Sequence, residues 1–258
     1  MKITKADFHN HLQTCKPTCS FNEVVDIVSK KLGDDGVIGV VNVGDDNRYE
    51  KFLGFKGYER KEIGAGFYVP EKSVFVVKGQ EVQTKQGHLL ILGIEKDKHL
   101  KNYNTIEDAI AEARDLGGVI IASHPFFLQG IGFYLQEHLS LLTLIDAIEV
   151  HNGEAVFGNK KTQEFYKFMK EDFPHLGAIS TSDGHSLAET GSSYTLIYGL
   201  NMNGLTESLR YAIRNNLDYE MNTSYLSAFN HMLDSACITA LRKARLDKFA
   251  ERLLGKEF

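Results

Sequence analysis

The chain has 258 residues, a formal net charge of −5 and 24% charged residues. This length suits one large α/β domain or two small ones. The negative net charge argues against broad nonspecific binding of nucleic acids, although it does not exclude a local basic groove. No stretch approaches the ~20 consecutive apolar residues that span a bilayer, and the start of the chain has no signal-peptide core. We therefore expect a cytoplasmic protein with no membrane partner.

Short apolar runs rich in β-branched residues predict buried strands, because each run is bounded by Gly, Asp or Asn. In chain order these runs cover residues 37–43, 74–77, 89–94, 119–122, 147–150 and 177–181. Helix patterns lie between several of them. Such alternation indicates a parallel sheet with helices packed on it.

The predicted helices have recognisable ends. Ser20 and Glu23 form a capping-box signature before the first helix, which we expect to end at Gly33. Its apolar face is formed by Val24, Val25, Val28 and Leu32. A second helix is predicted from Thr105 to the pair Gly117-Gly118. The last two are expected at residues 160–171, with Phe165, Phe168 and Met169 inward, and at about 205–215.

Some seven or eight strands in this length favour an α/β fold with a closed or nearly closed barrel. An open doubly wound sheet is the second choice. No Gly-x-Gly-x-x-Gly follows an early strand, so the dinucleotide-binding version of that sheet has no support. We expect residues 1–258 to form a single barrel domain. It would carry an irregular charged excursion at about 44–72 and a C-terminal helical extension at about 224–254.

Polar residues gather where the predicted strands end, and parallel α/β barrels build their active sites at that edge. Asp7, His9 and His11 alternate along the first strand and should point the same way. Phe8 should then face the opposite layer. Two imidazoles on one strand face can bind a divalent metal, and Asp7 could orient one of them. Alone, this pattern more often marks two surface histidines.

The later strand ends carry the same residue types. They present Glu81, His88, His124, the pair Glu149 and His151 on one face, and the pair Asp183 and His185. Each feature alone favours a structural role. As a set they are informative, because six of the 10 histidines lie at such positions. Mixed imidazole and carboxylate ligands suit Zn, Mn or Fe.

In order and spacing these motifs resemble the PHP family, named for its polymerase and histidinol phosphatase members. The resemblance covers nearly the whole barrel. It is carried by Asp7-Phe8-His9-Asn10-His11, Gly79-Gln80-Glu81-Val82, Gly87-His88, Ser123-His124-Pro125 and Ser182-Asp183-Gly184-His185. The resemblance implies a distorted (β/α)7 barrel that hydrolyses phosphoesters with two or three divalent metal ions, commonly Zn, Mn or Fe.

The resemblance also implies a role for each matched residue. The ligands of a first metal would be His9, His11, Glu81 and Asp183. The ligands of a second would be Glu81, His88 and His124, with Glu81 bridging the two metals. His185 would belong to a third metal.

The sequence departs from the family pattern around that third metal. Lys16 stands where the family commonly has an acid or a His, and Asp46 stands where it has a His. We therefore expect the third metal to be absent or weakly bound, with Asp46 supporting the site and Lys16 holding a substrate phosphate. The alternative is that Lys16 lies on a variable loop. His151 is a further candidate as a substrate contact, an extra ligand or a supporting group.

The expected function is phosphate ester hydrolysis at a site of two or three metal ions that activates water. His185 is the preferred proton shuttle, because Asp183 cannot be both a firm ligand and a free base. The expected substrate is a small phosphorylated molecule or a short oligonucleotide.

Three alternative functions remain open. A nuclease acting on short RNA or DNA would need a basic groove with aromatic side chains that stack on bases. A candidate patch contains Lys51, Phe52, Phe55, Lys56, Tyr58, Arg60 and Lys61. We expect its aromatic rings rather to face the barrel. The same metals could instead hydrolyse an amide or another non-phosphate bond. A non-catalytic regulatory module is supported only by the altered third site.

Overall fold

The computed structural model describes residues 2–12, 19–44, 46–155 and 157–222. All of them belong to one compact unit, residues 1–223. Lys16 and the predicted helical extension at 224–254 lie outside the described residues. Among the described residues, no helix is long and apolar enough to cross a membrane.

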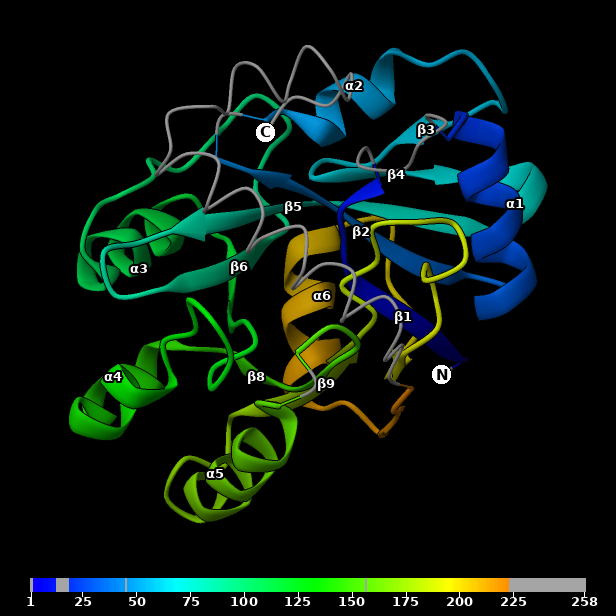
Figure 1. The fold of residues 1–258 in the computed structure, drawn as a ribbon. Helices are drawn as coiled ribbons and strands as arrows, with labels where there is room; N and C mark the ends of the chain where they lie inside the picture. The colour runs from blue at the N-terminus through cyan, green and yellow to red at the C-terminus, as the bar shows by residue number, and fades with distance from the viewer. Residues whose placement is uncertain (1, 13–18, 45, 156, 223–258) are drawn as a thin grey trace, which may run out of the picture. The chain divides into compact units, whose positions relative to one another are not determined.

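A curved, mixed sheet forms the centre of this unit (Figure 1). The main path of the sheet is β11-β10-β1-β2-β5-β6-β7-β8-β9. The strands on it are β1 (Ile3–Asn10), β2 (Gly36–Val43), β5 (Val74–Gln83), β6 (His88–Leu92), β7 (Val119–Ala122), β8 (Ala147–Asn152), β9 (Gly177–Thr181), β10 (Tyr194–Tyr198) and β11 (Asp218–Glu220). An isolated bridge between Asn10 and Gly184 brings the end of β1 beside the chain that follows β9. The sheet is therefore a nearly closed barrel, as predicted.

The sheet is not wholly parallel, which corrects the sequence prediction. The pairs β1–β2, β2–β5, β7–β8 and β8–β9 are parallel, but β6 is antiparallel to both β5 and β7. A tight turn joins β5 directly to β6, with Thr84 N donating to the Gly87 carbonyl at 2.9 Å. Gly87 has φ 142, a conformation that favours glycine. This hairpin places His88 beside the end of β5 without an intervening helix.

The helices follow the sequence patterns closely. They are α1 (Phe21–Leu32), α2 (Arg48–Gly54), α3 (Ile106–Asp115), α4 (Gly132–Glu137), α5 (Asn159–Asp172) and α6 (Leu205–Arg214). Ser20 and Glu23 form the predicted capping box, and Thr105 caps α3. Phe168 was expected to face inward but is 70% exposed. Only Phe165 and Met169 of that trio are buried, because these two lie four residues apart on one helix face.

The excursion at 44–72, which was predicted to be irregular, contains regular secondary structure. Besides α2 it contains the hairpin of β3 (Lys61–Glu62) and β4 (Gly66–Val69), and β4 pairs with β5. A short 3₁₀ turn covers Pro70–Lys72 at the end of the excursion, and another covers Leu139–Leu144 elsewhere in the chain. The aromatic side chains of the excursion pack inward, as expected. Phe52 is 2% exposed, while Phe55 and Tyr58 pack against the same apolar cluster.

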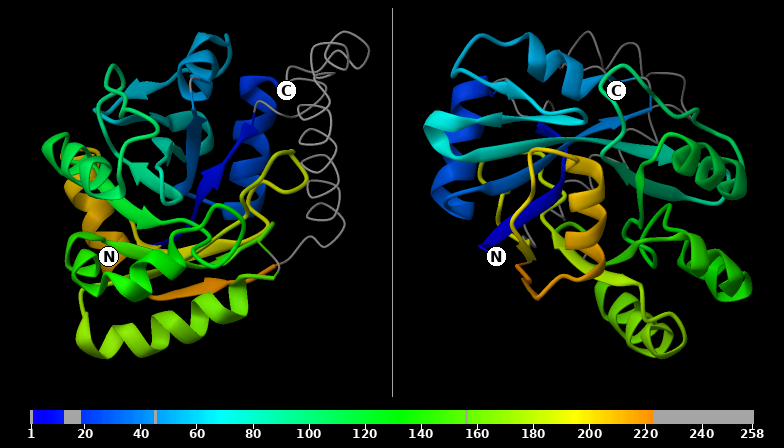
Figure 2. Two further views of the ribbon diagram at one scale, coloured as in Figure 1. Left: turned by 60° about the vertical axis from the view of Figure 1, so that its left-hand side comes forward. Right: turned by 180° about the vertical axis from the view of Figure 1, so that it is seen from behind.

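An apolar cluster on one face of the sheet supports the site. It contains alternate residues of the barrel strands, which pack against Leu209, Ala212 and Ile213 of α6. Figure 2 shows the α6 ribbon, in orange, beside the strands of the sheet. Phe75 and Val77 of β5 are members, and Glu81 continues their alternation toward the end of the strand. The cluster therefore forms the floor beneath the polar residues at the strand ends.

Candidate metal centre

Three side chains from the two strands that meet at the barrel closure form the first polar group. The Nε2 atoms of His9 and His11 lie 3.0 Å apart. The Asp183 carboxylate lies 3.0 Å from His11 Nε2 and 3.6 Å from His9 Nε2. All three residues are buried. Their ligand atoms converge closely enough to hold one metal ion.

The β5–β6 hairpin and the end of β7 build the second group. Glu81 Oε1 lies 2.8 Å from His88 Nδ1 and 2.9 Å from His124 Nε2. Glu81 also approaches the first group, at 3.9 Å from His9 Nε2 and 3.7 Å from His11 Nε2. Glu81 is thus the residue that lies between the two groups.

The donor chemistry of both groups fits a cation. His9 Nδ1 lies 3.0 Å from Glu149 Oε1, so a neutral His9 that donates there presents the Nε2 lone pair to the centre. A second imidazole nitrogen faces that lone pair at 3.0 Å, and a metal ion shared by both nitrogens removes this conflict. Imidazole and carboxylate together suit Zn, Mn or Fe.

Local backbone strain accompanies two of these residues. His124 has φ 29 and Asp183 has φ 50, values that residues other than glycine seldom adopt. Such strain persists when the surroundings enforce it, and it concentrates at functional sites. Around Asp183, hydrogen bonds hold the backbone and the side chain in place. Asn152 donates to its Oδ2 at 2.9 Å, and the preceding Ser182 is held by Asp7 through its N–H at 3.0 Å and its hydroxyl at 2.6 Å.

Glu149 contacts a histidine of each group, a supporting role that the sequence did not reveal. Besides its contact with His9, it accepts a hydrogen bond from the His124 backbone N–H at 2.6 Å. It also accepts from Asn152 Nδ2 at 3.0 Å and from the Thr181 hydroxyl at 2.5 Å. The residue is fully buried. A carboxylate that orients a ligating histidine in this way is a common support of metal sites.

The charges of the centre follow from burial and from neighbouring groups. Burial raises the pKa of the Glu81 carboxyl, but the adjoining His124 and His88 outweigh it and hold that pKa well below its ordinary value. Burial lowers the pKa of His9, yet Asp183 and Glu149 raise it well above its ordinary value. Burial lowers the pKa of His11 to about 3. The ionised Glu81 and the neutral His11 are already in the forms that metal binding requires, whereas a bound cation would take the place of the proton that Asp183 and Glu149 favour on His9.

A third group contains Glu154, which the sequence reasoning missed. Glu154 Oε1 lies 3.0 Å from His185 Nδ1, and these two residues converge with Asp183. Burial raises the pKa of Glu154 to about 7. Glu154 stands in the loop after β8, outside the strand-end pattern. Its only sequence signal was its position two residues after the end of β8 at Asn152.

His151 does not reach this centre, which corrects the prediction that it shares a face with Glu149. The register between β8 and β9 shifts between these two residues, because Glu149 pairs with Ile179 and His151 pairs with Ser180. Asn152 therefore points toward the site, while His151 Nε2 lies 3.1 Å from the Asn222 carbonyl oxygen.

A similar irregularity occurs in β1, whose register with β2 shifts between Asp7 and Asn10. Phe8 packs with Ala6 in the apolar cluster beneath the site. Asp7 contacts Ser182 and the Gly191 backbone N–H, and it makes no hydrogen bond with a described histidine. Asp7 is linked to the centre through the segment that carries Asp183.

Asp46 is a member of none of the three groups. Its carboxylate pairs with Arg48 at 2.9 Å and with Lys51 at 2.7 Å. Lys16, the other residue at which the family pattern is altered, is outside the described residues. The structure thus brings together seven of the predicted residues: His9, His11, Glu81, His88, His124, Asp183 and His185.

Comparison with known proteins identifies the fold. No family model and no curated protein sequence matches the chain. Solved structures do match. PsfC from Pseudomonas syringae superposes with a TM-score of 0.64 at 14% identity, covering 93% of this chain and 100% of that one. A two-domain protein from Bacteroides vulgatus with a predicted PHP-like metal-dependent phosphoesterase gives 0.59 at 18% identity, covering 86% and 65%.

Endonuclease Q, solved with a 27-mer duplex that has an abasic lesion at the active site, gives a TM-score of 0.56 at 18% identity. That match covers 85% of this chain and 58% of the endonuclease chain. The chain therefore spans less than two thirds of the last two proteins. These likenesses confirm the PHP-type barrel that the motifs predicted.

Proposed function

We propose that this chain is a metal-dependent phosphoesterase with two divalent metal ions at the ends of its barrel strands. The observation that carries the proposal is the convergence of six ligand-type side chains, all but His88 buried, in two groups with Glu81 between them. The first ion would be held by His9, His11 and Asp183, and the second by His88 and His124, with Glu81 bridging. When bound, such ions would supply Lewis-acid catalysis and activate water.

The remaining polar residues have roles in orientation and proton transfer. Glu149 orients His9, and Asn152 fixes one oxygen of Asp183. We assign proton transfer to His185, because Asp183 is committed to the two histidines of the first group. Glu154 holds His185 Nδ1 and so sets the orientation of that ring. The Glu154–His185–Asp183 group is also the candidate for a third ion.

A small phosphate monoester is the substrate that we favour over an oligonucleotide. Single-stranded nucleic acids are bound by exposed aromatic rings beside basic side chains. The candidate segment for that role has Phe52 buried and the Tyr58 hydroxyl bonded to Asp26 at 3.0 Å. The similarity to Endonuclease Q keeps a nuclease as the second candidate.

One experiment separates these functions. The protein is purified without chelator, its bound metal is counted per chain, and hydrolysis of p-nitrophenyl phosphate and bis-p-nitrophenyl phosphate is measured on the same sample. We expect about two ions per chain and a preference for the monoester. Preference for the diester would favour the nuclease. Absence of metal after reconstitution with Mn or Zn would refute the enzyme and favour a regulatory module.

A further inference from the structure

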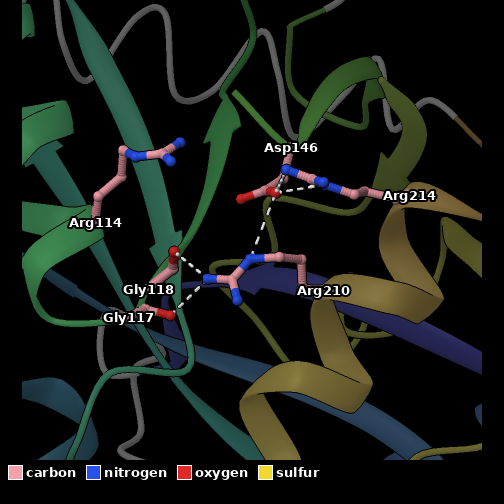
Figure 3. Close-up of a pocket in the computed structure, with 6 residues that line it drawn as sticks. All are labelled: Arg114, Gly117, Gly118, Asp146, Arg210 and Arg214. Carbon is pink, nitrogen blue, oxygen red and sulfur yellow. Dashed lines mark hydrogen bonds and ion pairs between the residues drawn. The ribbon is translucent and has the colours of Figure 1, made fainter. Parts of the chain in front are cut away.

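A second polar site lies at the opposite end of the same strands. A cavity of about 320 Å³ is lined by Arg114, Gly117, Gly118, Asp146, Arg210 and Arg214 (Figure 3). The two glycines precede β7, whereas His124 follows it. Asp146 precedes β8, whereas Asn152 ends it. The cavity is therefore separate from the metal centre.

Two of the three arginines are fixed in place by neighbouring groups. Arg210 and Arg214 lie four residues apart on α6 and so project from the same helix face. Arg210 donates from NH2 to the carbonyl oxygens of Gly117 and Gly118 at 2.6 and 2.9 Å. Arg214 contacts Asp146 Oδ1 through Nε at 2.7 Å and through NH2 at 2.6 Å. These contacts set the direction of both guanidinium groups before any ligand arrives.

The residues that line the cavity carry more positive than negative charge. They include three guanidinium groups and one carboxylate, and Oδ2 of that carboxylate already accepts the Ile120 backbone N–H at 2.9 Å. Arg210 Nε reaches Asp146 Oδ1 only at 3.5 Å. Arg114 extends toward the same space, is exposed, and has no side-chain partner among the described residues. Several N–H donors therefore remain for a ligand.

We propose that this cavity binds a phosphate group, either inorganic phosphate or the phosphate of a small metabolite. Guanidinium groups match phosphate oxygens with paired hydrogen bonds, and prior orientation lowers the entropy cost of binding. The volume lies near the lower limit of small-molecule pockets, which favours a compact ligand. A ligand there would join the end of α3 to α6 and the start of β8. This proposal does not depend on the activity proposed for the metal centre.

The test uses titration calorimetry on the full-length, metal-loaded protein at constant ionic strength, because salt screens exposed charges. The probes are inorganic phosphate, methylphosphonate as a mimic of a monoester, and acetate. The lead variant is Arg114→Gln, since Arg114 has no described partner whose loss would unfold the protein. Lys30→Gln is the matched control, because Lys30 is also an exposed cation in the last turn of a helix.

We expect Arg114→Gln to raise the Kd for phosphate about tenfold and Lys30→Gln to leave it nearly unchanged. Binding at this cavity is distinguished from binding at the metals by hydrogen exchange. Phosphate should slow exchange at residues 116–118 and 205–214 in the wild type but not in Arg114→Gln. Preference for methylphosphonate over phosphate would identify a metabolite as the ligand, and the reverse would identify inorganic phosphate. Equal weakening by both variants, equal binding of acetate, or unchanged exchange in these segments would overturn the proposal.

Discussion

The two ends of β7 and β8 offer opposite chemistry on the same framework. At one end, buried carboxylates face imidazole nitrogens, with Glu81 and Asp183 held between histidines. At the other end, guanidinium groups outnumber the single carboxylate of Asp146. Arg210 and Arg214 keep side-chain exposures of 30% and 34%, whereas Glu81 and Asp183 keep 7% and 11%.

The difference shows how burial raises the free energy of an unpaired charge. Ionised groups taken from water need close partners, so the buried end has nearly every charge matched within one network. The half-exposed end tolerates surplus positive charge because water still solvates it. A buried network rich in acceptor atoms suits a cation, and an exposed cluster rich in donors suits an anion. Substitutions at the two ends would test this contrast between a buried, matched network and an exposed surplus of charge.

The largest effect is expected from Glu81→Gln. The amide keeps the size of the side chain but removes the negative charge that lies between the two groups of histidines. We expect metal content to fall and turnover of p-nitrophenyl phosphate to drop about a thousandfold, equivalent to ~4 kcal/mol. Glu71→Gln, at an exposed carboxylate, serves as the control. Wild-type metal content and turnover in Glu81→Gln would remove the central role of this residue.

A smaller effect is expected from Glu149→Gln. Glu149 is not one of the proposed metal ligands, but it accepts hydrogen bonds from His9, the His124 backbone N–H and the Thr181 hydroxyl. Each oxygen of Glu149 accepts two hydrogen bonds, Oε1 from His9 and Thr181 and Oε2 from His124 and Asn152, so the amide nitrogen would leave two donors without an acceptor and loosen the ligands that they hold. We expect metal affinity to fall ~10- to 100-fold, as measured by competition with a chelator. Glu164→Gln, at an exposed position of α5, should not change affinity. Equal affinity in the two variants would reduce Glu149 to a packing residue.

The motif-bearing part of this centre could be predicted from the sequence because its residues stand at strand ends. His124 and Asp183 each follow a clear apolar run, His9 lies near the end of β1, and strands of a barrel bring such ends together. The capping box at Ser20 was equally readable, because its two hydrogen bonds join residues close in sequence. Local patterns with local causes were predicted well.

The supporting residues could not be predicted because they depend on contacts between distant segments. The register shift in β8 exchanges His151 for Asn152 at the site, and it arises from pairing with β9 rather than from a signal in β8 itself. Glu154 follows β8 in a loop, where alternation has no predictive value. The strand β6 was predicted, but its antiparallel direction was not, because an apolar run does not indicate the direction in which it pairs with its neighbours.

Glu154→Gln tests the supporting residue that lies in the loop after β8. If Glu154 acts by orienting His185, then kcat should fall about tenfold while the number of bound metals stays the same. The measurements are steady-state kinetics and metal content on one preparation. Glu171→Gln is the control, since Glu171 is exposed near the end of α5. Loss of one metal ion instead would assign Glu154 as a ligand, and an unchanged kcat would show that His185 does not need it.

The smallest effect is expected at the arginine-rich end, from Asp146→Asn. The asparagine oxygen can still accept the Ile120 N–H, but the charge that pairs with Arg210 and Arg214 is lost. Because both arginines are about one third exposed, water compensates part of this loss, and we expect unfolding free energy in urea to fall by only ~1–2 kcal/mol. Phosphate should bind a few-fold tighter to the same variant, since the acid that competes for the guanidinium groups is gone. Asp172→Asn, at an exposed carboxylate, should change neither quantity. Weaker phosphate binding in Asp146→Asn would mean that the carboxylate positions the arginines more than it competes with the anion, and the contrast between the two ends would then be one of geometry rather than of surplus charge.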